Sequence, residues 1–210
     1  MKYKLFIVGR NGVGKDRIAQ RLSRDFDLNL LCSHTDRPRR TYETNGENHI
    51  FNTKEEIDKI LEKSDTFVYS ESACDEYRCC ANIRQFKLCD ILVIDPTGIE
   101  YIKKFFPDEK FYIIHIYMSD EEERRERLRR RGDRYEDFLD KCKKENDIFN
   151  KFESEKNWDI SFDNSEYFYN TYETLIKKIR DLEFSPILDK EENLEINNDI
   201  IEMSNLRNTK

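Results

Sequence analysis

One stretch decides the fold of this chain: Leu5-Phe6-Ile7-Val8-Gly9-Arg10-Asn11-Gly12-Val13-Gly14-Lys15. An apolar run of strand length precedes the glycines, and Ile18, Ala19 and Leu22 follow at the spacing of one helical face. A strand, a glycine-rich loop that ends in Gly-Lys, and a helix are typical of a phosphate-binding P-loop. Backbone N–H groups and the helix N-terminus surround the phosphate in such a loop, and the lysine adds a positive charge. The sequence therefore predicts a nucleotide-phosphate site.

The residue after the lysine departs from this motif. A Ser or Thr usually stands there, and its hydroxyl helps to hold Mg²⁺. This chain has Asp16 in that place, followed by Arg17. A chance turn between strand and helix is the alternative interpretation, but a Gly-Lys pair framed by both elements favours the phosphate site.

Composition bounds the class of protein. The chain has 210 residues, enough for one medium domain with small inserted lobes, and a net charge of −7. This acidic balance argues against general affinity for nucleic acids or membranes, and no apolar run approaches the length of a membrane span. The chain begins directly with a strand, so we expect no leader and a cytoplasmic protein. Reduced packing thiols are expected of the six cysteines, which show neither a Cys-x-x-Cys pair nor a zinc-ligand spacing: Cys32, Cys74, Cys79, Cys80, Cys89 and Cys142.

Strand-like and helical patterns alternate along the chain. Alternation of this kind predicts an α/β fold with a parallel sheet covered by helices on both faces. Helix starts are expected at Thr53, Thr97 and Ser119, each with Glu three residues later as in a capping box. The strand-like runs are Leu5–Val8, Leu28–Leu31, Ile91–Ile94, Phe111–Tyr117 and a weaker one near Trp158–Phe162.

Two segments interrupt the alternation. Residues 34–85 contain short strand candidates and a helix, which suggests an inserted lobe. Residues 126–147 are charged and poor in apolar side chains, so we expect them outside the core. The remaining segments, 1–33, 86–125 and 148–183, form the predicted core of a domain over 1–183, and 184–210 is expected to be a loose C-terminal tail.

A basic loop follows the second predicted strand: Ser33-His34-Thr35-Asp36-Arg37-Pro38-Arg39-Arg40-Thr41-Tyr42-Glu43. Arginines around a proline are suited to hold a phosphate through two parallel hydrogen bonds. On composition alone, a solvated basic turn is the favoured interpretation.

This segment resembles the guanylate kinases, whose Ser-x-Thr-x-Arg-x-x-Arg-x-x-Glu-x-x-Gly-x-x-Tyr-x-Phe pattern spans the same loop. The resemblance continues through Ile91–Gly98 and Arg127–Asp133, and covers roughly residues 3 to 182. The positions that align without a gap are Ser33, Thr35, Arg37, Arg40, Glu43, Gly46 and Phe51.

The resemblance implies a P-loop kinase fold and ATP-dependent phosphorylation of a nucleoside monophosphate (NMP), with ATP and Mg²⁺ as cofactors. It makes residues 34–85 the NMP-binding lobe and 126–147 a lid, and it assigns catalytic roles to Lys15, Arg127 and Arg131. The ATP-binding residues that it implies are Gly9, Arg10, Asn11, Gly12, Val13, Gly14, Lys15 and Asp16. The predicted acceptor-binding residues are Ser33, Arg37, Arg40, Glu43, His49, Glu71, Arg78 and Asp95.

Three groups of residues depart from the family pattern. Asp16 replaces the metal-binding hydroxyl, and Val93 replaces an acidic residue two positions before Asp95. We therefore expect no direct side-chain ligation of Mg²⁺, which phosphates and water would hold, with Asp16 or Asp95 as candidates for further contact. Where the family reads guanine with a glutamate and a Ser or Thr, this chain has Tyr69 and Cys80. His49 replaces a phosphate-contacting tyrosine, and Glu71 is expected to point to the same face as Tyr69 and to restore part of the recognition.

Two classes of function remain open. The first is an NMP kinase, with GMP or dGMP as the best single guess and a deoxynucleotide kinase of different base preference as a variant. The second is a non-catalytic guanylate-kinase-like module that binds a protein through the old acceptor site. Lys15, Arg127 and Arg131 favour the enzyme, whereas Asp16 and Val93 favour the module. Small nucleotides are the expected partners, without nucleic acid or membrane.

Overall fold

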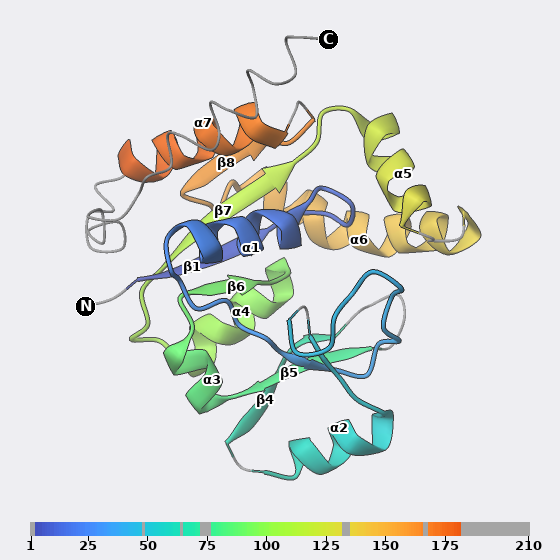
Figure 1. Cartoon of the computed structure of the whole chain (residues 1–210), viewed down its shortest axis with the longest axis vertical. Coiled ribbons are helices and arrows are strands. Elements are labelled where there is room, and N and C mark those ends of the chain that lie inside the picture. Colours follow the sequence, from blue (N-terminus) through green and yellow to red (C-terminus); the bar gives the residue numbers. More distant parts are fainter. Residues whose placement is uncertain are drawn as a thin grey trace, which may run out of the picture.

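A computed structural model of the chain is built around a four-stranded parallel sheet in the order β6-β1-β7-β8 (Figure 1). The structure describes residues 3–47, 49–63, 65–71, 77–131, 135–165 and 168–181; it omits the side chains of 70–71, 135–142, 144, 168–171 and 180–181. The strands of this sheet are β1 (Lys4–Val8), β6 (Ile91–Val93), β7 (Phe111–Tyr117) and β8 (Ile160–Asp163).

Helices cover both faces of this sheet. Successive β1 side chains alternate between the faces. Leu5 and Ile7 join the hydrophobic core under α1 (Lys15–Asp25) and α7 (Phe168–Asp181). Phe6 and Val8 join the core formed with α3 (Ile83–Leu88), α4 (Pro96–Phe105) and α6 (Tyr135–Glu155). The α/β prediction with a doubly covered parallel sheet is therefore confirmed.

A second sheet lies beside the first, in the order β3-β2-β5-β4 (Figure 1). Strands β4 and β5 form an antiparallel pair with an irregular register between Val68 and Ser70. Helix α2 (Lys54–Leu61) begins at the predicted capping box of Thr53 and Glu56. The strands are β2 (His34–Thr35), β3 (Ile50–Phe51), β4 (Thr66–Glu71) and β5 (Arg78–Asn82).

Two predicted helix starts are wrong by one or two residues. Helix α4 begins after Asp95, whose carboxylate accepts from the N–H of Gly98, and Pro96 occupies its first turn. Helix α5 (Glu121–Arg130) begins after Asp120, which accepts from the N–H of Glu123. In both helices an aspartate occupies the N-cap position, which only one side chain can fill. The predicted caps, Thr97 and Ser119, therefore do not fill it.

The strand predicted over Leu28–Leu31 is also wrong. Within this stretch the structure forms only an isolated bridge between Leu30 and Ile91. The expectation that residues 126–147 lie outside the core fails at Leu128 and Glu145, which are both buried. In the described part of the chain, no helix is long and apolar enough to span a membrane. The predicted tail, residues 184–210, lies outside the described residues.

Candidate active site

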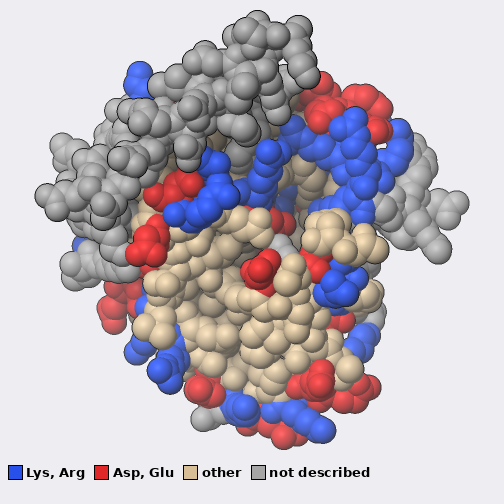
Figure 2. Space-filling view, viewed as in Figure 1, with Lys and Arg blue, Asp and Glu red and all other residues tan. Residues whose placement is uncertain are grey.

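A cavity of about 660 Å³ lies where the predicted phosphate loop meets the basic loop. Its walls come from Gly9, Asn11, Gly12 and residues 14–17 of the phosphate loop, from the loop and strand over 33–49, from β4 and β5, and from α5 and α6. Arg127 and Arg131 line it from the α5 side. Figure 2 shows Lys and Arg side chains gathered over α5, beside the hollow of this face. One cavity thus joins segments that are far apart in the sequence.

The phosphate loop is shaped by its glycines. Gly14 precedes α1 with φ of 93°, a left-handed conformation that glycine adopts without strain. Gly9 has no room for a side chain, since a Cβ there would lie 2.2 Å from the carbonyl oxygen of Ile116. The backbone therefore enters and leaves the loop in a conformation that other residues would disturb.

Lys15 bends back over this loop. Its Nζ atom donates to the carbonyl oxygens of Gly9 at 2.6 Å and Arg10 at 3.0 Å. Burial lowers the pKa of Lys15, while the nearby carboxylates of Asp16 and Glu145 act in the opposite direction. The ammonium group is positioned at the cavity wall, where an incoming phosphate can replace the two carbonyls.

Glu43 organises the basic loop. Its two carboxylate oxygens accept from Arg37 at 2.7 and 3.1 Å, and they also accept from the backbone N–H of Arg40 at 2.8 Å and its side chain at 3.3 Å. Arg37 also lies over the Phe51 ring, 5.4 Å from its centroid. Glu43 thereby orients both arginines on the cavity wall.

Stability should follow the charge of Glu43. Burial raises the pKa of this carboxyl, but hydrogen bonds from Arg37 and Arg40 outweigh it and leave the pKa below its ordinary value of 4.5. Because the native state then binds the proton less tightly than the unfolded chain, the stabilisation is present above pH 4.5 and is lost as the pH falls through the native pKa. We expect Glu43→Gln to cost about 2 kcal/mol at pH 7. Urea unfolding should show wild type and variant converging at acid pH; a difference that does not change with pH would contradict this origin.

The cavity is also lined by Tyr69, Tyr77 and Cys79. Desolvation raises the pKa of Tyr69 well above its ordinary value, so the phenol stays neutral; it also hydrogen-bonds Ser33. The Cys79 thiol lies 3.7 Å from the hydroxyl of Thr35. Cys80, which we aligned with the base-reading hydroxyl, is fully buried and does not line the cavity, because neighbouring strand residues face opposite ways. Its neighbour Cys79 lines the cavity instead.

His49 and Asp95 both reach the cavity, as predicted. The Nδ1 atom of His49 lies 2.9 Å from the Ser33 hydroxyl, and burial lowers the pKa of the imidazole. One oxygen of Asp95 accepts from Gly98 at 2.7 Å and from Thr97 at 2.6 Å. Of the predicted acceptor residues, the structure thus brings Ser33, Arg37, Arg40, Glu43, His49 and Asp95 together.

Arg78, Val13 and Arg10 do not line this cavity. Arg78 pairs with Asp36 at 2.8 Å and with Asp58 at 2.6 Å. Val13 packs in the core, and Arg10 turns toward α6. The backbone of Glu71 ends β4, but its side chain lies outside the described residues.

Helix α6 contributes residues that sequence reasoning missed. The cavity is lined by Glu145, Ile148 and Phe149 of this helix. From the sequence we expected the first part of α6, up to residue 147, to form only a charged lid. Asn164 is a further missed residue. Its side-chain NH₂ group donates to the backbone carbonyl of Val13 at 2.7 Å, and its backbone carbonyl accepts from Arg127 at 3.1 Å. A polar residue directly after a buried parallel strand was the available signal for Asn164.

Three acidic side chains lie near Lys15. Asp16, Glu145 and Asp95 each raise the pKa of Lys15 and line the cavity. Among the described residues, no group of three or more His, Cys, Asp or Glu side chains is arranged to hold a metal ion. This donor set fits a hydrated Mg²⁺ carried on phosphates, which keeps several waters, better than a metal held by protein ligands alone.

Comparisons of the sequence with known proteins indicate one family. The model of the family described as "Guanylate kinase" matches residues 1–182. The chain is 31% identical over 143 residues to the guanylate kinase of Caldanaerobacter subterraneus, covering 64% of this chain and 67% of the relative. It is 31% identical over 137 residues to that of Porphyromonas gingivalis, covering 61% and 72%. The crystal structure of guanylate kinase from Anaplasma phagocytophilum has the same fold, with a TM-score of 0.61, 16% identity and 89% coverage of each chain.

Proposed function

The chain belongs to the guanylate kinase family, and from this we propose that it transfers a phosphoryl group from ATP to a nucleoside monophosphate, with GMP or dGMP as the best acceptor. One observation carries the proposal. A single cavity joins Lys15 of the phosphate loop to the Arg37–Arg40 pair and to Arg127 and Arg131 of α5. Two phosphate chains that face each other need positive charge from several sides, and this cavity supplies it.

Positioning and charge account for the chemistry. Phosphoryl transfer requires little covalent participation by the protein, so the enzyme mainly aligns the two nucleotides and stabilises the transferring group. In our proposal Lys15 contacts the ATP phosphates, and Arg37 and Arg40 hold the acceptor phosphate. Arg127 and Arg131 approach the transferring group, while residues 34–85 act as the NMP-binding lobe and 126–147 as the lid.

Magnesium supplies neutralisation of phosphate charge when it is bound. Asp16 and Asp95 are the residues that we propose to contact its water shell, since both line the cavity near Lys15. Holding the metal through phosphates and water compensates for the missing P-loop hydroxyl.

The residues at the predicted base-reading positions depart from the family pattern. Tyr69 and Cys79 stand on the proposed base wall, and Glu71 ends the same strand as Tyr69. A deoxynucleotide kinase with a different base preference is therefore the variant to test. Free thiols at the described Cys32, Cys79, Cys80 and Cys89 agree with a reducing compartment, and we propose the cytoplasm.

A coupled ADP-release assay with Mg-ATP against each NMP and dNMP tests the proposal. We expect turnover with GMP or dGMP at a kcat within the usual range of kinases, about 1–100 s⁻¹. Other bases should react with lower kcat/KM. Absence of turnover above a no-acceptor control with every acceptor would favour the non-catalytic module.

A further inference from the structure

Arg10 belongs to the phosphate loop, but its guanidinium points to α6. Its Nε and Nη2 atoms donate to the two carboxylate oxygens of Glu153 at 3.0 and 2.8 Å. Nη2 also donates to the side-chain oxygen of Asn150 at 2.9 Å, and Nη1 donates to that of Asn146. These partners are spaced as i, i+4 and i+7, so they form one stripe of the helix.

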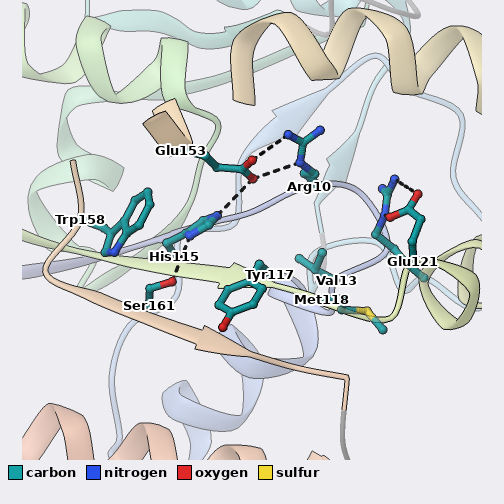
Figure 3. A pocket seen from close by; sticks show the side chains of 10 residues that line it. Arg10, Val13, His115, Tyr117, Met118, Glu121, Glu153, Trp158 and Ser161 are labelled. Atoms are coloured by element: carbon teal, nitrogen blue, oxygen red, sulfur yellow. Dashed lines mark hydrogen bonds and ion pairs between the residues drawn. The ribbon is translucent and has the colours of Figure 1, made fainter. Parts of the chain in front are cut away.

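On the side away from Arg10, Glu153 faces His115. Figure 3 shows it between Arg10 and His115, at the edge of a second cavity of about 450 Å³. The Nε2 atom of His115 lies 3.6 Å from a Glu153 oxygen, and Nδ1 lies 3.2 Å from the hydroxyl of Ser161. Trp158 stacks on the imidazole with a centroid distance of 4.5 Å. The Arg10 side chain is only 16% exposed, so this fork is more than a solvated surface pair.

The next residue of the loop is fastened at both of its backbone groups. The N–H of Asn11 donates to Glu145 of α6 at 2.6 Å. The carbonyl of Asn11 accepts from Arg124 of α5 at 2.8 Å. Meanwhile Lys15 donates to the carbonyl of Arg10 itself. The peptide group between Arg10 and Asn11 therefore contacts both the proposed catalytic lysine, through its carbonyl, and α6, through its N–H.

The same helix also faces the substrate cavity. Ile148 and Phe149 line that cavity, and the Arg10 guanidinium lies over the Phe149 ring, 5.4 Å from its centroid. Phe149 thus contacts Arg10 and borders the space where an acceptor nucleotide would lie. A shift of α6 on filling of the cavity would reach the phosphate loop through these contacts.

On the basis of the kinase function proposed above, we infer that Arg10 is a positioning residue that couples the phosphate loop to α6. It acts through the Gly9–Lys15 backbone and does not touch the nucleotide. The consequence of this coupling is that an acceptor bound against α6 raises the affinity for ATP. By thermodynamic linkage, bound ATP raises the affinity for the acceptor by the same factor.

Calorimetry with the non-hydrolysable β,γ-imido analogue of ATP, with and without saturating GMP, measures this coupling. We expect wild type to bind the analogue about tenfold more tightly with GMP present. Arg10→Met should reduce that factor to about one and should leave the affinity for GMP alone almost unchanged. By the same linkage, its affinity for GMP in the presence of the ATP analogue should fall about tenfold. Arg10→Lys should recover only part, because an ammonium cannot form the planar fork. The matched control is Arg21→Met, which removes an arginine paired with Asp25 on its own helix α1 and should leave the factor unchanged.

Variants on the α6 side test the inference even if Arg10→Met does not fold. Asn150→Ala and Glu153→Gln should each lower the coupling factor, and Arg10→Met with Glu153→Gln should be no worse than Arg10→Met alone. A wild-type factor of one, or a normal factor in Arg10→Met with only a lower Tm, would overturn the inference. If wild type binds both ligands but phosphorylates no monophosphate, the proposed function fails while the binding factors still decide the role of Arg10.

Discussion

Replacing Lys15 with methionine is expected to lower kcat about 10³-fold, the largest effect of any single substitution in this site. The ammonium group is held at the cavity wall by the carbonyls of Gly9 and Arg10, 2.6 and 3.0 Å away. A phosphate that enters the loop offers this ammonium a full negative charge in place of two neutral acceptors. The interaction grows as charge develops on the transferring group, so its loss should appear mainly in kcat. Methionine retains most of the length of the side chain and fills the same space without charge.

Lys4→Met is the matched control for burial of a lysine. Lys4 is also buried, and its Nζ donates to the carbonyl of Cys89 at 2.8 Å, far from the cavity lining. This substitution should lower Tm while leaving kcat per folded molecule unchanged. Steady-state kinetics and thermal unfolding of both variants give the comparison. A Lys15→Met enzyme within tenfold of wild type would mean that another cation carries the ATP phosphates.

Local patterns predicted the parts of the site that depend on local structure. The glycines and Lys15 identify the phosphate loop, because a strand, a turn with left-handed glycines and a helix start follow one another along the chain. Arg37, Arg40 and Glu43 lie within one loop, so their motif also carries their mutual contacts. These predictions needed no knowledge of distant segments.

The direction in which a side chain points, and the distant segments that it contacts, explain what could not be predicted from the sequence. The sequence predicts that Glu145 lies on a charged surface. In the structure it is buried, because Asn11 and Arg124 from other segments contact its carboxylate. By sequence Arg10 belongs to the phosphate loop, but its side chain is long enough to donate hydrogen bonds to three residues of α6. We expected Cys80 in the cavity wall, but Cys79 lines the cavity and Cys80 is buried, because neighbouring residues of a strand face opposite ways.

The acceptor side should show the second largest effect. Arg37→Met is expected to raise KM for GMP about 10²-fold, since a charge-assisted bidentate contact contributes about 1.5–3 kcal/mol. Affinity for the β,γ-imido ATP analogue should stay within about twofold, because Arg37 belongs to the basic loop and not to the phosphate loop. The fold should tolerate the change, as Glu43 retains the backbone and side-chain hydrogen bonds of Arg40. Arg40→Met should act in the same direction.

Arg39→Met provides the control on the same loop. Arg39 is exposed, donates to the backbone carbonyl of Glu43 at 2.6 Å and does not line the cavity. It carries the same charge as Arg37 two residues away, so general electrostatic attraction of GMP would weaken equally in both variants. A large KM change for Arg37→Met with a small one for Arg39→Met therefore identifies a directed phosphate contact. Equal changes would indicate that the loop acts only through its net charge, and a loss of ATP-analogue affinity in Arg37→Met would mean that the donor and acceptor walls have been assigned the wrong way round.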